Sequence, residues 1–210
     1  MYCILITGIP ASGKSTIADA LSKRLSLPVL SKDGFKEVLF DTIGFESRQE
    51  KVRLGTAAME IMYHAAAQLM KVQIPFILEN NFEYASRKGL DRLLSQTDCP
   101  VLTITLTGDY ETLYLRFLQR NAGLDRHRGH IVNDCYPEKR IRSAEELLKN
   151  TITLDQFVEG IHARGFDRFV GGQDQIVIDT TEFSKVDVDA LISQIEAWRE
   201  SLKTCSEYEV

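Results

Sequence analysis

The 210-residue sequence has little that would place it in a membrane, in an oxidising compartment or on a nucleic acid. No apolar run reaches the roughly 18 residues needed to cross a bilayer. The four cysteines are scattered without CxxC spacing, which indicates reduced thiols and a cytoplasmic setting. The formal net charge is −5, which excludes a uniformly basic surface for nucleic acid.

No internal repeat or low-complexity tract is present. Short β-branched runs alternate with helical patterns, which predicts an α/β fold with a parallel sheet. We expect both faces of the sheet to be covered, because the predicted strands are continuously apolar. These strands span 2–7, 28–30, 75–79, 101–106 and 175–179. Helices are predicted at 14–26, 34–41, 47–72, 84–96, 109–121 and 186–202.

The stretch 123–172 interrupts this alternation. It is rich in glycine, has no clear strand, and has helical pieces near 138–149 and 154–163. A long insertion between a helix and the last strand is typically functional or mobile. We therefore predict one domain over residues 1–210, with residues 123–172 forming an inserted lid or substrate flap.

The strongest pattern is the phosphate-binding motif GxxxxGK[ST], which reads Gly8-Ile9-Pro10-Ala11-Ser12-Gly13-Lys14-Ser15 and is followed by Thr16. A predicted strand precedes it and a predicted helix follows. In such a loop, backbone amides cradle phosphates at the start of the helix. Lys14 would reach the β- and γ-phosphates, and the Ser15 hydroxyl would bind Mg²⁺. The pattern predicts ATP and Mg²⁺ as cofactors, and a plain glycine turn is the alternative.

Together with Leu30-Ser31-Lys32-Asp33 after the second predicted strand, this motif resembles P-loop kinases of the nucleoside-monophosphate-kinase-like group. Within that group the chain is similar to the AAA_33 or zeta-toxin-like branch. Chloramphenicol phosphotransferase and the 5′-kinase domain of polynucleotide kinase are relatives. The resemblance implies a kinase with a five-stranded parallel sheet in the order 2-3-1-4-5, sandwiched by helices.

Asp33 lies where the resemblance implies an acidic residue facing the acceptor hydroxyl. Such a carboxylate can orient the hydroxyl and take its proton. Lys32 and Lys36 flank it as candidate substrate-binding residues. The pattern Lys32-Asp33-x-x-Lys36 is similar to the Asp-x-x-Arg of polynucleotide kinases, with Lys replacing Arg. The alternative for Asp33 is an N-cap of the helix at 34–41.

Three polar residues follow the third predicted strand. Glu79 takes the position that the resemblance gives to a Walker-B acid, where a carboxylate could hold Mg²⁺ through water. Asn80 and Asn81 come next, at the strand end where ligands bind in open α/β sheets. Their amides are candidate contacts to the acceptor, and a simple turn is the alternative.

Positive charge is concentrated between positions 116 and 142, with seven Lys or Arg residues against three acids. The resemblance implies that arginines here bind adenine or neutralise the transferred phosphate. We assign Arg120 and Arg126 to catalysis, and Arg116 and Arg128 to nucleotide binding. The alternative is a solvated face paired with nearby acids. The nearby His and Cys residues lack a fourth ligand at zinc spacing, so no zinc site is predicted.

The sequence thus favours a kinase that phosphorylates a hydroxyl of a small molecule, without membrane or nucleic-acid partners, as a monomer or homodimer. Two other classes stay open. One is a polynucleotide 5′-kinase, which would need a continuous basic groove with aromatic side chains on which bases stack. The other is a nucleotide-dependent switch or regulatory NTPase that binds a partner, although the sequence has no NKxD base-reading motif of GTPases.

Overall fold

A computed structural model describes residues 1–123, 126–140, 142–149 and 151–207 of the chain. Four residues of the predicted lid therefore lie outside the described part. They include Asp125, one of the three acids counted in the basic stretch above. The account that follows is restricted to the described residues.

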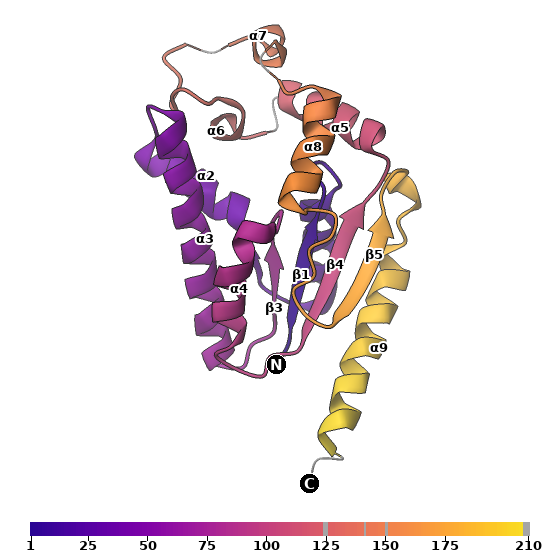
Figure 1. The fold of residues 1–210 in the computed structure, drawn as a ribbon. Helices are drawn as coiled ribbons and strands as arrows, with labels where there is room; N and C mark the ends of the chain where they lie inside the picture. Colours follow the sequence, from indigo (N-terminus) through magenta and orange to yellow (C-terminus); the bar gives the residue numbers. More distant parts are fainter. Residues whose placement is uncertain (124–125, 141, 150, 208–210) are drawn as a thin grey trace.

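The centre of the fold is a parallel sheet of five strands in the order β2-β3-β1-β4-β5 (Figure 1), as the resemblance implied. All four pairings are parallel, so the carboxyl ends of the strands share one edge of the sheet. The strands are β1 (Cys3–Gly8), β2 (Val29–Ser31), β3 (Phe76–Glu79), β4 (Val101–Thr107) and β5 (Asp174–Asp179).

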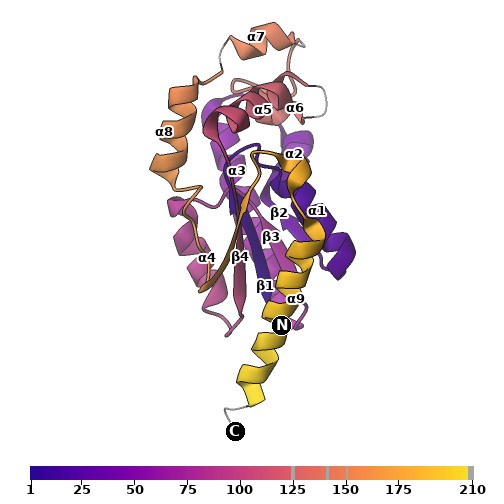
Figure 2. The same cartoon turned by 90° about the vertical axis from the view of Figure 1, so that its right-hand side faces the viewer.

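Helices cover the sheet on both faces (Figure 2). On one face, α1 and α9 pack against β1 and β4 through a cluster that contains Ile17, Leu21 and Ile195. On the other face, α3 and α4 bury Met62, Met70 and other apolar side chains. The helices are α1 (Lys14–Leu25), α2 (Lys32–Ile43), α3 (Arg48–Lys71), α4 (Arg87–Leu94), α5 (Tyr110–Ala122), α6 (Arg128–Ile131), α7 (Ala144–Leu148), α8 (Leu154–Arg164) and α9 (Val188–Glu207), with 3₁₀ turns η1 (Tyr84–Ser86) and η2 (Phe183–Lys185).

Two sequence predictions need correction at the fold level. The edge strand β5 is not covered on both faces, because Ile176 and Ile178 pack toward α9 while Val177 is 59% exposed on the opposite face. The helix predicted at 138–149 is mostly irregular, and only α7 is helical there. A capping box between Ser143 and Glu146 starts α7, which explains the late beginning.

The part of the predicted lid that holds α6, α7 and α8 lies above the carboxyl ends of the strands (Figure 1). These three helices are arranged around that end of the sheet (Figure 2). Residues 165–172 instead run back along the sheet to the start of β5, and the Gly171 amide donates to the Thr103 hydroxyl at 3.0 Å. Within the described ranges, no helix is both long enough and apolar enough to span a bilayer.

The chain leaves β1 through a close approach to the neighbouring strand β4. Gly8 has φ +131°, and an added Cβ would lie 2.0 Å from the carbonyl oxygen of Leu106. The next amide, of Ile9, donates to the same oxygen at 3.1 Å. Only glycine fits this turn, because any side chain would collide with backbone atoms of β4.

We predict that Gly8→Ala lowers the free energy of unfolding by about 2–4 kcal/mol, through backbone strain and overpacking. Gly160→Ala in α8 is the matched control, since a Cβ added to Gly160 would have no other atom within 4 Å. That change should stabilise the protein by about 0.5–1 kcal/mol. Urea unfolding of both variants measures the difference, and equal effects would contradict the close approach.

Candidate functional site

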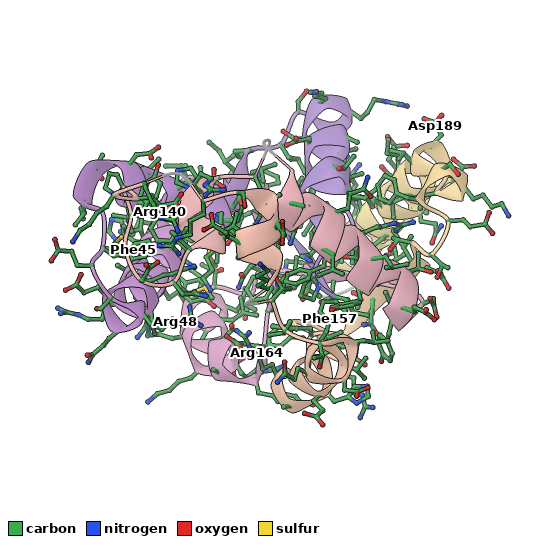
Figure 3. The ribbon with its side chains drawn as sticks, turned by 90° about the horizontal axis from the view of Figure 1, so that it is seen from above. Phe45, Arg48, Arg140, Phe157, Arg164 and Asp189 are labelled. Atoms are coloured by element: carbon green, nitrogen blue, oxygen red, sulfur yellow. The ribbon has the colours of Figure 1, made fainter. Side chains whose placement is uncertain are left out.

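A cavity of about 640 Å³ opens at the carboxyl ends of the strands. Its walls come from the Pro10–Thr16 loop, the starts of α2 and α3, the end of β3, helices α5 and α8, and the residues around α6. Figure 3 looks onto this end from above, with Arg48 of α3, Phe157 and Arg164 of α8 labelled. Every wall therefore belongs to an element that ends or begins at this edge of the sheet.

The GxxxxGK[ST] loop forms the floor of the cavity, and α1 starts there. Gly13 is the residue before the helix, with φ 89°, and no side chain caps the helix amides. No acidic residue occupies the first turn of α1. The amino-terminal amides and the positive end of the helix dipole are thus open to an anion. Ser12 is buried beneath the loop and does not line the cavity.

Lys14 folds back over the loop. Its Nζ donates to the carbonyl oxygens of Gly8 at 3.2 Å and Ile9 at 2.8 Å. Burial lowers the pKa of Lys14 to about 8, although Glu79 opposes the shift. An anion in the loop would favour the charged ammonium and raise this pKa again.

Ser15 and Glu79 face each other across the cavity floor. The Ser15 hydroxyl donates to Oε1 of Glu79 at 3.4 Å, and Ser31 donates to Oε2 at 2.5 Å. Burial raises the pKa of Glu79, while the Ser31 hydrogen bond and Lys14 lower it. A hydroxyl and a carboxylate are the oxygen donors that Mg²⁺ takes beside phosphate oxygens and water, so this pair fits that ion.

Asp33 lines the same cavity from the first turn of α2. The capping alternative is wrong, because α2 begins at Lys32 and its N-cap is Ser31, whose Oγ accepts from the Gly34 amide at 3.4 Å. Burial opposes ionisation of Asp33, but His130, Lys36 and other neighbouring basic groups outweigh it. The net effect lowers the pKa, so the side chain is a carboxylate at neutral pH.

The other predicted substrate residues also reach the cavity wall. Lys32 and Lys36 project from α2, and Asn81 follows β3. Asn80 lies beside them but is only 7% exposed, and its Nδ2 contacts the Met59 sulfur at 3.8 Å. Asn80 is therefore held mainly by the protein, whereas Asn81 presents more surface to the cavity.

Arg120 of α5 and Arg126 face the phosphate-binding loop from above. Burial, together with the charge of Arg126, lowers the pKa of Arg120 to about 10, and burial lowers that of Arg126. The Nε and Nη1 atoms of Arg126 are buried without a hydrogen-bond partner among the described residues. Buried donors normally find partners, so Arg126 is suited to receive negative charge, and Arg120 adds a second positive charge on the same cavity wall.

The two remaining predicted arginines have different positions. Arg116 lines the cavity, and its Nη1 and Nη2 donate to the carbonyl oxygens of Thr180 and Thr181, each at 2.6 Å. Arg128 is not brought to the cavity. Its guanidinium makes two hydrogen bonds to Glu138, at 2.7 and 2.9 Å. The phosphate contact predicted for Arg128 is therefore not found, and the paired-face alternative describes it.

Several cavity residues were not identified from the sequence. Lys51 of α3 donates to the carbonyl oxygens of His130 at 2.8 Å and Val132 at 2.5 Å, and to Oδ1 of Asn133 at 3.1 Å. It thereby ties the residues after α6 to α3. Arg48 of α3 and Arg164 of α8 also line the cavity. The only sequence signal for Lys51 is a lysine in a helix stripe that is otherwise apolar.

Positive charge dominates this cavity. Its lining includes nine lysines and arginines but only two carboxylates, Asp33 and Glu79. Burial lowers the pKa of His130 to about 3, so that ring adds no charge at neutral pH. Such an excess in a protein with net charge −5 is costly without ligands, and it indicates a site for strongly anionic molecules.

Comparison with known families agrees with this geometry. The family AAA_33, described as an AAA domain, matches residues 3–131, which include the phosphate-binding loop, Asp33 and Glu79. The chain belongs to the AAA_33 family. This is the branch of P-loop kinase-like domains that the sequence motifs resembled. No curated protein sequence matches the chain significantly.

Solved structures extend the likeness to nearly the whole chain. A "putative kinase" from Chloroflexus aurantiacus J-10-fl has a TM-score of 0.73 and 27% identity, with 95% of this chain and 96% of that chain covered. Shikimate kinase from Bacteroides thetaiotaomicron has a TM-score of 0.54, 15% identity and coverage of 95% and 98%. A gluconokinase from Sinorhizobium meliloti 1021 has a TM-score of 0.50, 12% identity and coverage of 98% and 97%. The last two show the shared fold alone.

The charged cavity gives a prediction about pH. Burial lowers the pKa of Lys36 to about 8. Below that pH the side chain is charged and the buried charge destabilises the ligand-free fold, whereas above it the side chain becomes a neutral amine and this cost is relieved. Lys36→Met should therefore raise the melting temperature at pH 7. The gain should shrink by pH 9.5, where the folded wild type has already lost the charge. Thermal melts of both proteins at the two pH values measure this, with Lys23→Met on exposed α1 as control.

A constant difference between Lys36→Met and wild type across this pH range would contradict the assigned cause. A Lys23→Met variant whose melting temperature changes with pH as that of Lys36→Met does would also contradict this cause.

Proposed function

We propose that the protein is an ATP-dependent kinase that transfers the γ-phosphate to a hydroxyl group of a small-molecule acceptor. The observation that carries this proposal is a single cavity that contains both halves of such a reaction. The open start of α1, with Lys14 and Ser15, lies on its floor, and the Asp33 carboxylate lies on its wall.

The nucleotide half follows from the loop and its surroundings. The amides at the start of α1 and the Lys14 ammonium would hold the phosphates. Ser15 and Glu79 would hold Mg²⁺, which supplies charge neutralisation between the phosphates when bound. Arg116, fixed on the Thr180 and Thr181 carbonyls, would lie beside the base. Arg120 and Arg126 would neutralise charge on the phosphate in transfer, because their guanidinium groups have no protein carboxylate within ion-pair distance among the described residues.

The acceptor half centres on Asp33. An ionised carboxylate can accept a hydrogen bond from a hydroxyl and hold its oxygen toward the phosphate. Its lowered pKa favours this orienting role over strong general-base catalysis. Lys32, Lys36 and Asn81 surround the space that the acceptor would occupy. We further propose that residues 123–172 act as a lid over this space, since they supply Arg126 and α8 to its walls.

The runner-up activity is 5′-phosphorylation of a polynucleotide, and the charge of the cavity is the observation in its favour. Against it, the aromatic residues that line the cavity are Phe117, Phe157 and Phe166, which also pack in a buried cluster with Leu113 and Ile161. They offer no row of exposed rings on which successive bases could stack. A screen of labelled ATP against alcohols, sugars, nucleosides, hydroxy acids and an RNA with a 5′-hydroxyl end separates the two activities. ATP turnover without any acceptor would indicate a regulatory NTPase instead.

The first functional prediction concerns Lys14. Mg·ATP should raise the melting temperature of the wild type, because a ligand that binds only the folded state stabilises it by mass action. In Lys14→Met the shift should largely disappear and phosphate transfer should be lost, while the ligand-free protein still melts cooperatively. Lys23→Met is the control and should keep the full shift. A wild type that gives no calorimetric heat with millimolar Mg·ATP would refute the kinase proposal.

The second functional prediction concerns Asp33→Asn. If the carboxylate orients the acceptor, single-turnover transfer should fall by roughly 10²-fold, the usual cost of a misplaced reacting group. The affinity for ATP should change little, because Lys14 and the loop amides hold the nucleotide. Stability should fall by no more than about 1–2 kcal/mol, since Ser31 caps α2 and Asp33 contributes through the helix dipole and through longer-range attraction to Lys32 and Lys36.

Asp19→Asn, on the exposed side of α1, is the matched control for this change. Transfer at the wild-type rate by Asp33→Asn would remove Asp33 from the catalytic residues and direct attention to Glu79.

A further inference from the structure

Four cations gather on the side of the cavity away from the phosphate-binding loop. Lys32 and Lys36 come from the start of α2, and Arg48 and Lys51 come from the start of α3. We call them the α2–α3 basic cluster. All four also line a second depression of about 330 Å³ that continues from the main cavity along α3. The cluster therefore lies at the junction of two connected spaces.

No carboxylate neutralises the α2–α3 basic cluster. None of its members makes an ion pair with an acid among the described residues, and Asp33 acts on Lys32 and Lys36 only at longer range. Lys36 Nζ instead lies 5.3 Å from the centre of the Phe40 ring. Arg48 has one hydrogen bond, to Oδ1 of Asn133 at 3.3 Å.

The acidic residues that line the second depression do not form ion pairs with the cluster either. Glu83 binds Arg164, with the shorter contact at 2.5 Å, and Glu60 binds Arg92 at 2.6 Å. Each of these carboxylates thus has its own arginine. Among the described residues, the four cations of the cluster therefore have no carboxylate within ion-pair distance, and Asp33 and Glu83 act on them only at longer range.

Mg·ATP would not supply the missing charge. That ligand carries about two net negative charges. Together with the carboxylates of Asp33 and Glu79, it supplies about four negative charges against eight cations, which are Lys14, Arg116, Arg120, Arg126 and the α2–α3 basic cluster. An uncharged acceptor would then leave an excess of about four positive charges beside the buried Lys51 and the half-buried Lys32 and Lys36, which is unfavourable.

In the ligand-free protein, the unfavourable environment of these charges already shows in the pKa values of two of the lysines. Burial, reinforced by neighbouring cations, lowers the pKa of Lys51 to about 7. Burial likewise lowers the pKa of Lys32. Depressed pKa values of this kind gather at functional sites, where a ligand provides the absent partner.

We propose that the acceptor carries a negatively charged group of its own, a phosphate ester or a carboxylate, and that Lys36 and Arg48 bind this group while Asp33 holds the reacting hydroxyl. Lys32 adds charge from α2, and Lys51 fixes the neighbouring backbone. The proposal deepens the proposed kinase function and rests on it for the identity of the reaction. The size of the second depression suits a small metabolite rather than a polymer.

The direct test uses inorganic phosphate as a probe of the acceptor side. The protein is first saturated with Mg²⁺ and a non-hydrolysable ATP analogue, so that the loop around Lys14 is occupied. Phosphate, or malonate as the carboxylate arm, is then titrated by calorimetry at constant ionic strength. We expect saturable binding of at least one of the two anions to the wild type, and at least tenfold weaker binding to Lys36→Met and to Arg48→Met.

Lys23→Met serves as the control and should bind the anion like the wild type. Both site variants should bind the ATP analogue within about threefold of the wild type, which shows that they are folded. Absence of saturable binding by both anions, or equal binding to wild type and site variants, would overturn the proposal.

The two proposals can fail separately. If the ATP analogue does not bind but phosphate binding still depends on Lys36 and Arg48, the kinase proposal fails and the anion site stands. Turnover provides a second check with matched acceptors, such as gluconate against glucose and glycerol 3-phosphate against glycerol. Preference for the neutral member of every pair would contradict an anion-bearing acceptor.

Discussion

The close approach of Gly8 to β4 is the constraint on which the rest of the site depends. Because the chain passes within hydrogen-bond reach of the Leu106 carbonyl, it can turn from the central strand directly into α1. That turn leaves the start of α1 uncapped and aimed at the edge where all five strands end. The neighbouring strands then bring Glu79 from β3 and Asp33 from the start of α2 to the same edge, as parallel sheets do.

Much of this arrangement could be predicted from the sequence, because its signals are local. The loop motif fixes one strand, one helix and the ligand between them, and the resemblance supplied the strand order that the structure confirms. The start of α2 was placed two residues late, because Ser31 and Asp33 are both good capping residues and only tertiary contacts choose between them. Arg128 was predicted to bind the nucleotide, but in the structure it pairs with Glu138. Glu138 lies ten residues away in an irregular segment, where no helix or strand periodicity could indicate the contact.

Lys32 and Lys36 of the α2–α3 basic cluster were predicted beside Asp33, but Arg48 and Lys51 could not be predicted, for a related reason. Charges at the start of a long amphipathic helix normally belong to a solvated face, and an otherwise apolar stripe is the only local sign that Lys51 is 3% exposed. Its partners lie some eighty positions along the chain. The cavity therefore combines a loop of consecutive residues, which the sequence reveals, with charged residues that come together only after folding.

The pairing of β5 with β4 has a consequence for how the chain can be divided. The family match ends at residue 131, but the carbonyls that hold Arg116 belong to Thr180 and Thr181, after β5. A polypeptide cut at residue 131 would also expose one edge of β4, a strand that is buried over most of its length. Unpaired edges of this kind invite association with other chains. The folding unit is thus larger than the segment by which the family is recognised, and proteolysis near that boundary would yield a fragment prone to aggregation rather than a smaller folded domain.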